Sequence, residues 1–322
     1  PCGAGFYTFC LREIMLEVLS KAAAFILIIA IGYGFKKKGI FAPNDYQLVA
    51  KIILNITLPC AVISSFAHFK MDYSLIIAVF LGLIMNVAMM LTALLLTRRE
   101  TPAAKIFYIF SLAGYNIGCF SMPFVQAFLS PFAVIAICMF DVGNSIMCTG
   151  LTYALTASCI GYADGQKDSF SLRSIVDKLL HSAPFMIYNI MLALSLLGVH
   201  FPAPVYTFTQ LVGAANPFLS MLMIGMMFEI KLDKKSLGYI KELFGWRYGV
   251  SLAFAAACLY FAPFSAEVNY VLALAVMAPC TIIGPIFVEK LGGNVQLASL
   301  FNSLTIVISV ALFTAFFIVI HA

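Results

Sequence analysis

The sequence predicts an all-α, polytopic membrane protein with ten transmembrane helices, arranged as two inverted five-helix repeats. Three observations carry this prediction: the composition, the length of the apolar stretches, and an internal repeat. Of the 322 residues, 63% are hydrophobic and 10% are charged, and the mean hydropathy is +1.02. Globular domains contain about 25% charged residues, so a soluble fold could not bury this much apolar surface. The apolar stretches are long and continuous rather than short and alternating, so the spans are expected to be helices.

Short polar links separate the apolar stretches from one another. The expected spans cover residues 18–36, 47–67, 74–96, 104–128, 131–160, 182–199, 206–229, 243–263, 268–288 and 295–320. Residues 1–14 are expected to form an N-terminal extension, followed by a first five-helix repeat over 15–160. The longest polar link, 161–181, mixes acidic and basic residues. It is expected to form an amphipathic helix on the cytoplasmic surface before the second repeat, 182–322.

The Lys and Arg residues are concentrated in every second link. They are Lys36, Lys37, Lys38 and Lys51 in the first link, Arg98, Arg99 and Lys105 in the third, Lys167, Arg173 and Lys178 in the fifth, Lys231, Lys234, Lys235, Lys241 and Arg247 in the seventh, and Lys290 in the ninth. Only Arg12, Lys21 and Lys70 lie elsewhere. Cytoplasmic links attract positive charge. These links are therefore expected in the cytoplasm, with both termini on the outer side of the cell (inner) membrane.

Short motifs recur in the two halves of the chain, about 158 residues apart. Pro59 matches Pro217, Asn144 matches Asn302, and Pro123 matches Pro279. Each half would hold five spans, and an odd number of spans gives the second half the opposite orientation. Inverted repeats with broken helices near the bilayer midplane are typical of secondary transporters that work by alternating access.

The fourth and ninth spans are the ones expected to be broken. Gly114, Gly118 and Pro123 interrupt the fourth span, and Pro279 and Pro285 interrupt the ninth. Proline removes a backbone donor and clashes with the preceding turn. A broken backbone at membrane depth persists only where protein buries it or where it lines a wet cavity. The two breaks are therefore expected to form the two halves of a substrate site; the simpler alternative is an ordinary proline kink.

Three motifs resemble those of the auxin efflux carrier family of bacterial and plant membrane transporters. They are Asn55-Ile-Thr-Leu-Pro59, Gly114-Tyr-Asn-Ile-Gly118 followed by Met122-Pro123, and Asp141-Val-Gly-Asn144. The resemblance extends from Met15 to the C-terminus. The chain lacks the long hydrophilic central loop of the long plant members, so it is similar to the bacterial type.

The resemblance implies a fold related to the bile acid/sodium symporters. Spans 1, 2, 6 and 7 would form a scaffold, and spans 3–5 and 8–10 a transport domain in which spans 4 and 9 cross at the site. Bacterial relatives are associated with small organic acids such as dicarboxylates, and plant relatives with auxin. A homodimer formed through the scaffold helices is a further expectation.

Asp141 is the main ionisable candidate inside a span. It lies more than two helical turns from either polar end of its apolar stretch. A carboxylate at the centre of a membrane helix costs about 2.5–3.5 kcal/mol on insertion scales. It is expected to face the protein interior and to pair, bind a cation or become protonated. A proton- or sodium-coupling site is one interpretation; a structural carboxylate that is hydrogen-bonded between helices is the other.

Asn116 and Asn144 are the main candidates for substrate binding, because an amide offers both donors and acceptors to a carboxylate. A broken helix also presents backbone N–H groups that favour anions. The remaining candidates are Asn55 and Asn302, Pro123 and Pro279 as backbone breakers, and Cys119, Ser121, Cys280 and Thr281 as flanking residues. The alternatives are interhelical hydrogen bonding for the asparagines and packing for the small residues.

No motif of an enzyme, a phosphate-binding loop or a cluster of metal ligands occurs in the sequence, and no cofactor is expected. Nothing in the composition points to a nucleic acid partner. The expected function is that of a secondary transporter or facilitator which moves a small organic anion across the membrane. A channel for small solutes and a membrane-embedded ligand sensor are the alternatives.

Overall fold

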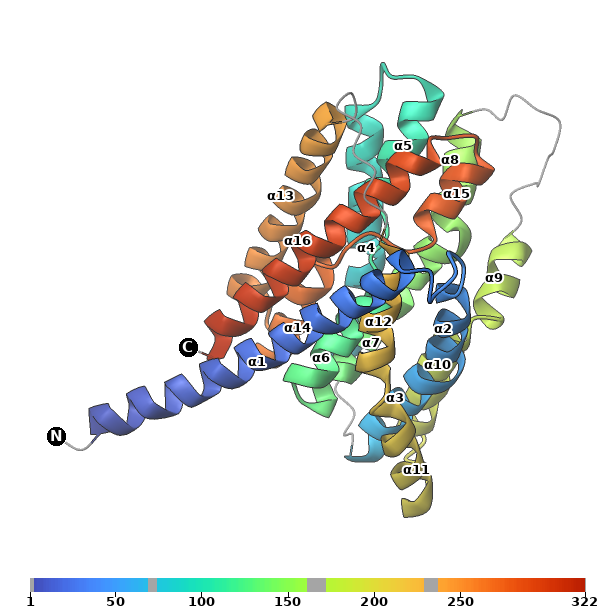
Figure 1. Ribbon diagram of the computed structural model, residues 1–322. Helices are drawn as coiled ribbons and strands as arrows, with labels where there is room; N and C mark the ends of the chain where they lie inside the picture. The colour runs from blue at the N-terminus through green and yellow to red at the C-terminus, as the bar shows by residue number, and fades with distance from the viewer. Residues whose placement is uncertain (1–2, 69–73, 161–171, 229–236, 322) are drawn as a thin grey trace.

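The computed structural model describes residues 3–68, 74–160, 172–228 and 237–321 (Figure 1). Within these ranges the regular secondary structure is helical, and the one exception is an isolated bridge between Tyr115 and Cys280. The prediction of an all-α protein is therefore confirmed for the part of the chain that the structure describes.

The helices follow one another through short connections. In the first half they are α1 (Gly3–Lys37), α2 (Tyr46–Ile52), η1 (Ile53–Thr57), α3 (Leu58–Ser65), η2 (Phe66–His68), α4 (Ser74–Leu96), α5 (Pro102–Leu112), η3 (Ile117–Ser121), α6 (Met122–Phe128), α7 (Pro131–Ile146), η4 (Met147–Leu151) and α8 (Thr152–Ile160). In the second half they are α9 (Leu172–Leu180), α10 (Ala183–Leu196), α11 (Ala203–Gly213), α12 (Asn216–Met227), α13 (Leu237–Phe261), α14 (Ala266–Val276), α15 (Gly284–Lys290) and α16 (Val295–His321).

Six helical segments among the described residues are long and apolar enough to cross a membrane. They are Met15–Lys37, Tyr46–Ser65, Leu75–Leu96, Pro131–Ile160, Ala203–Met227 and Val295–Ile320. Their length and composition are consistent with a membrane-embedded protein. The other four expected spans contain the shorter apolar helices α5, α6, α10 and α14, together with α13, which carries Lys241, Glu242 and Arg247.

The ends of the expected segments shift in two places. Helix α1 begins at Gly3, so it includes most of the residues expected to form a separate extension. The expected link at 161–181 contains the surface helix α9, while residues 161–171 lie outside the described residues. Helix α9 buries Ile175 and Leu179 and exposes Asp177 and Lys178, as an amphipathic helix does.

Hydroxyl caps and prolines set the start of several helices. Thr101 accepts a hydrogen bond from the backbone N–H of Ala104 at the start of α5, and Pro102 occupies the first turn. Ser130 caps α7 in the same way, with Pro131 next to it. A side-chain oxygen satisfies an N–H group that has no partner within the helix, and proline has no N–H to satisfy at that position.

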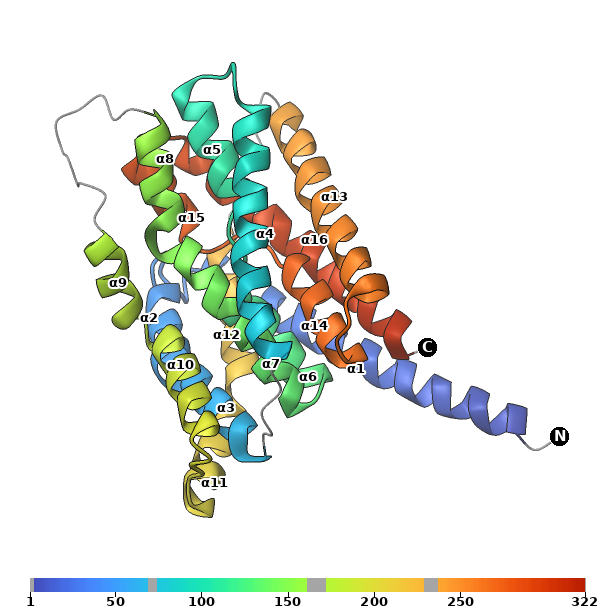
Figure 2. The ribbon, with the colours of Figure 1, turned by 180° about the vertical axis from the view of Figure 1, so that it is seen from behind.

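The helices pack as two groups. In the first group α1 lies along α12, and α3 packs against α10 and α11. In the second group α4 lies along α7, α13 packs on α14, and α15 packs on α16 and α5. Figures 1 and 2 show α2, α3, α10 and α11 together on one side of the molecule, with α13 and α14 on the other. The groups meet where α1 contacts α16, where α7 contacts α3 and α10, and where α12 contacts α6.

Glycines allow the closest helix pairs to form. Gly32 of α1 faces Gly225 of α12, and Gly82 of α4 and Gly143 of α7 each face the backbone of the opposite helix. A Cβ atom added at Gly143 would overlap the carbonyl oxygen of Val79. Small residues let helix backbones approach closely. In a membrane, lipid tails are as apolar as the side chains, so close van der Waals packing rather than the hydrophobic effect holds helices together.

We predict that Gly143→Ala destabilises the protein by about 1–3 kcal/mol, because the added methyl group must push α4 and α7 apart. The matched control is Gly249→Ala on α13, where nothing lies within 4 Å of the added Cβ atom. It should leave stability unchanged or raise it by about 0.5–1 kcal/mol, since alanine favours the helix. Thermal unfolding in detergent, followed with a thiol-reactive dye that detects the buried free cysteines, measures both. Equal melting temperatures for the two variants would contradict this account of the α4–α7 contact.

Candidate functional site

The two interrupted spans contact each other at their interruptions. Helix α5 ends at Leu112 and α14 ends at Val276, and both ends are buried. Beyond them, Tyr115 and Cys280 form an antiparallel bridge. The N–H of Asn116 donates to the carbonyl oxygen of Pro279 at 3.0 Å. The expectation of two breaks is thus met by a real pair of breaks, joined to one another through their backbones.

The break in the fourth expected span lies at residues 113–116, where Gly114 has a φ of +90°. Residues that carry a side chain rarely adopt that backbone conformation, and a Cβ atom at Gly114 would lie 2.8 Å from Cγ2 of Thr281. Gly114 therefore allows both the turn and the close approach of the other break.

The prolines do not all occupy the breaks. Pro279 lies at the crossing, whereas Pro123 lies in the first turn of α6, after the break and the π-helical turn η3. Pro285 has the equivalent place in the first turn of α15. The prediction that Pro123 interrupts the span is therefore wrong, because the helix continues through η3 into α6. Pro123 has no N–H to donate, and the π-helical turn before it accommodates the lost hydrogen bond, as η1 does before Pro59.

Asn144 of α7 supplies hydrogen bonds that the interrupted backbone lacks. Its Nδ2 donates to the carbonyl oxygen of Tyr115 at 2.9 Å, and its Oδ1 accepts from the N–H of Tyr115 at 3.1 Å. Asn86 of α4 donates to the same Oδ1 at 3.1 Å and accepts from the N–H of Gly114 at 2.7 Å. The amide of Asn144 is thus engaged with protein, an arrangement that favours the interhelical role over direct contact with a substrate.

Asp141 extends this network to the other group of helices. Its side chain is buried, with 6% of its surface exposed. One carboxylate oxygen accepts from Nδ2 of Asn144 at 2.8 Å, and the other accepts from the hydroxyl of Tyr188 on α10 at 3.3 Å. Among the described residues, no basic side chain forms an ion pair with Asp141. The carboxylate therefore bridges α7 and α10 through neutral donors.

Arg247 of α13 is a central residue of the crossing, although the charge pattern predicts it in a polar link. The charge pattern assigned it to the seventh link, but the structure buries it completely, with 0% exposed. Its guanidinium donates to the carbonyl oxygens of four residues at the two breaks: Ser111 at 3.0 Å, Leu112 at 2.7 Å, Gly114 at 3.2 Å and Ala278 at 3.0 Å. It also lies 5.0 Å from the centre of the Tyr115 ring. Its position within the expected span 243–263 was the signal for burial.

Residues of α16 satisfy the break in the ninth expected span. The hydroxyl of Thr305 accepts from the N–H of Cys280 at 3.2 Å, and that of Ser309 donates to the carbonyl of Met277 at 2.7 Å. Asn302 donates weakly to the carbonyl of Thr281 at 3.4 Å. The Oδ1 atom of Asn302 is buried and has no hydrogen-bond partner among the described residues.

A pocket of about 180 Å³ leads from the surface to Asn302. On one side it is bounded by the C-terminal ends of α1 and α12, and on the other by α15 and α16. The lining residues are Lys36, Pro43, Asn44, Tyr46, Met227, Ile282, Pro285, Ile286, Ser299, Asn302, Ser303 and Ile306. The pocket thus opens along the contact between the two helix groups and carries one cation, two amides and several hydroxyls.

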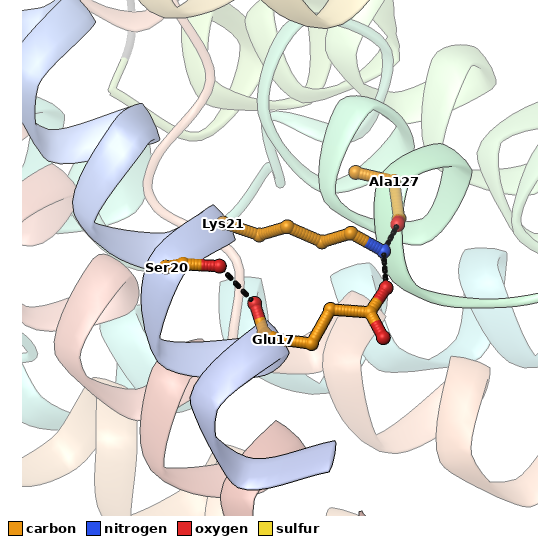
Figure 3. A network of polar contacts seen from close by, with 4 residues as sticks. All are labelled: Glu17, Ser20, Lys21 and Ala127. Carbon is orange, nitrogen blue, oxygen red and sulfur yellow. Dashed lines mark hydrogen bonds and ion pairs between the residues drawn. The ribbon is translucent and has the colours of Figure 1, made fainter. Parts of the chain in front are cut away.

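The same contact is closed toward the other ends of α1 and α16. Phe25 of α1 packs edge to face on Phe124 and Phe128 of α6, with ring centres 4.9 Å and 6.1 Å apart. Lys21 of α1 lies beside this cluster, with its ammonium 5.7 Å from the centre of the Phe128 ring. The same ammonium pairs with Glu17 at 2.8 Å and donates to the carbonyl oxygen of Ala127 at 3.1 Å (Figure 3). One end of the contact is therefore packed with aromatic rings while the other is hollow.

The other predicted site residues fall into two classes. Cys119 and Ser121 are buried in η3 beside the crossing, and neither Oγ of Ser121 nor Nδ2 of Asn116 has a partner among the described residues. Asn55 lies apart: its side chain is exposed and donates to the carbonyl oxygen of Lys51 in its own helix at 2.8 Å. The described residues contain no group of three or more His, Cys, Asp or Glu that could hold a metal ion.

A scan against models of known protein families finds no family that matches this chain, and a search of curated proteins finds no match.

We predict that Asn144→Ala destabilises the protein by more than about 2 kcal/mol, since buried groups of Tyr115, Asn86 and Asp141 lose their partner at about 1–3 kcal/mol each. Asn55→Ala is the matched control and should change stability by less than about 0.5 kcal/mol, because its amide is exposed. The two melting temperatures measured in detergent test this. A small effect of Asn144→Ala would show that the network is not structural.

Proposed function

We propose that this protein is a secondary transporter or facilitator that moves a small organic anion across the cell membrane by alternating access. We further propose that it has the ten-span, inverted-repeat fold of the auxin efflux carrier family, bacterial type, with both termini on the outer side. The observation that carries the proposal is the meeting of two interrupted, buried segments at Tyr115 and Cys280, next to a pocket between two helix groups. Such a crossing of broken helices is the usual site in transporters of this kind.

The helix contacts support two related halves. When each span of the first half is matched to the span at the same place in the second half, the contact of α1 with α12 corresponds to that of α10 with α3. The contacts of α1 with α16 and of α5 with α16 correspond in the same way to those of α10 with α7 and of α14 with α7. A pseudo-twofold relation between the halves accounts for this recurrence.

The chemistry of the pocket favours a small anion. The pocket is smaller than the cavities of about 300–1,000 Å³ that hold drug-sized ligands, at about 180 Å³. The ammonium of Lys36, which also donates to the carbonyl oxygen of Phe228 at 3.2 Å, supplies positive charge at the mouth. Deeper in, the hydroxyl of Ser299 supplies a donor for a carboxylate, and the unpartnered Oδ1 of Asn302 supplies an acceptor for a hydroxyl or protonated carboxyl group of the same substrate. A mono- or dicarboxylate of a few carbon atoms fits these features best.

The asymmetry of the contact between the helix groups suggests the motion. The group of α1–α3 and α10–α12 would act as the scaffold, and the group of α4–α8 and α13–α16 would carry the crossing. In the state described, the pocket opens at the Lys36 end, which we propose faces the cytoplasm because the basic residues favour that orientation. Rotation of one group against the other would close this end and separate the phenylalanine cluster at the opposite end.

Transport in proteoliposomes tests the proposal. Uptake of small radiolabelled carboxylates should saturate and should be accelerated by unlabelled anion on the opposite side. Lys36→Gln should lower uptake at low substrate concentration about tenfold or more, because a hydrogen bond to a charged group contributes about 1.5–3 kcal/mol. Lys37→Gln, an exposed neighbour, is the control and should behave as the wild type. Flux without saturation or countertransport would indicate a channel, and binding without flux a sensor.

We predict that Asp141→Asn removes the dependence of uptake on pH or on a coupling cation while the protein still folds. The amide is similar in size: its oxygen can accept from Nδ2 of Asn144, and its NH₂ group can donate to the hydroxyl oxygen of Tyr188. Asp45→Asn is the control: its carboxylate is exposed and accepts from the N–H of Ala42, away from the crossing. Initial uptake rates between about pH 5 and pH 8 measure the effect. An unchanged pH profile in Asp141→Asn would leave this carboxylate with a structural role only.

A further inference from the structure

Two half-helices point their C-terminal ends at one buried side chain. The last carbonyl groups of a helix have no partner within the helix. At the end of α5 these are the carbonyls of Ser111 and Leu112, and Arg247 binds both. Just beyond the end of α14, which lies at Val276, it binds the carbonyl of Ala278. The guanidinium is the one side chain of the described residues that joins both breaks through their carbonyls.

The electrostatic demand at this point is for a cation. Each helix C-terminus carries the equivalent of roughly half a negative charge, so the two together call for about one positive charge. The guanidinium supplies it, and the face of the Tyr115 ring at 5.0 Å adds to the attraction. No carboxylate among the described residues forms an ion pair with Arg247. The negative ends of the two helices, rather than an acidic side chain, therefore balance this buried charge.

Carbonyl groups arranged in this way are also the kind of site that binds a metal cation. In transporters with broken helices, unwound carbonyl groups and half-helix C-termini coordinate the coupling Na⁺. Here four carbonyl oxygens lie 2.7–3.2 Å from the guanidinium nitrogens. A second cation at this position would meet the fixed charge of Arg247 and would find the carbonyl oxygens already engaged.

We infer that Arg247 is a built-in cation that takes the place of a coupling Na⁺ at the crossing, so that the protein neither binds Na⁺ there nor requires it. As far as transport is concerned, this inference rests on the proposed function; as far as cation binding is concerned, it stands on the contacts alone. Arg247 belongs to α13, which packs on α14 and α5 in the same helix group as both breaks. Its charge therefore stays at the crossing throughout the proposed motion. Any ion coupling is then left to another group, of which Asp141 is the buried candidate.

Thermal unfolding of the purified full chain in detergent tests the inference without any transport assay. Melting temperatures are compared in about 150 mM NaCl and in the same concentration of choline chloride, so that the ionic strength is constant. An ion that binds only the folded state raises the melting temperature by mass action. We expect the wild type to melt within about 1 °C in the two salts. Saturable stabilisation by Na⁺ that persists when Asp141 is replaced by Asn would overturn the inference, because Asp141 is then excluded as the ion's site.

Three variants sharpen the test. Arg247→Met keeps much of the side-chain volume but leaves the carbonyls without a cation, so it should melt lower and should be stabilised by Na⁺ by about 3 °C or more. Arg247→Lys restores a positive charge as a compact donor and should be insensitive to Na⁺. Lys241→Met removes an exposed cation from the same helix and should match the wild type.

The outcomes separate clearly. A folded Arg247→Met variant that ignores Na⁺ would overturn the inference, since the vacated carbonyls would then not form a cation site. If Arg247→Met does not fold, the wild type and Arg247→Lys decide, because Na⁺ stabilisation of either that persists with Asp141→Asn contradicts the inference. Absence of anion uptake together with melting that is insensitive to Na⁺ would count against the proposed function and leave the inference in place.

Discussion

The structure depends on satisfying the backbone of two helices that stop inside the protein. Ending a helix leaves N–H and carbonyl groups without partners, and no water reaches them within an apolar interior. At this crossing the partners come from neighbouring helices. Asn86 and Asn144 bind the peptide groups of residues 114 and 115, Thr305 and Ser309 bind those of the other break, and Arg247 binds carbonyls of both.

This supply of partners makes one group of helices act as a unit. The side chains that hold the breaks come from α4, α7, α13 and α16, and each would lose buried hydrogen bonds if its helix moved away from the crossing. The contact with the other group is different in kind. It consists of edge-to-face phenylalanine contacts at one end, the pocket at the other, and polar bonds from single side chains: Tyr188 to Asp141, Gln126 to the carbonyl oxygen of Gly213, and Asn216 to Gln126. Aromatic packing can slide or separate with no unpaired polar group left behind, which suits the motion we propose.

Sequence reasoning located much of this, for reasons that are local. Gly114 and Pro279 mark the breaks because glycine and proline act on their own backbone. Asp141 and Asn144 stood out because a polar group inside an apolar stretch must find a partner. The charge pattern misplaced Arg247. The rule that assigns basic residues to cytoplasmic links does not tell a residue in the link just before a span from one in the first turns of that span. The prediction that Pro123 breaks its helix was wrong because a π-helical turn just before a proline lets the helix continue, and the sequence pattern did not reveal that turn.

The sequence by itself determined that the chain is helical and apolar enough to lie in a membrane, and that two of its stretches could not be regular helices. Those properties follow from composition and from single residues, such as Gly114. Only the tertiary structure decided which groups the breaks turn toward: that Asn144 is engaged with backbone, that Asn55 faces outward, and that Arg247 lies between two helix ends. Such partners are distant in the chain, and their meeting depends on how the helices pack, which no local pattern records.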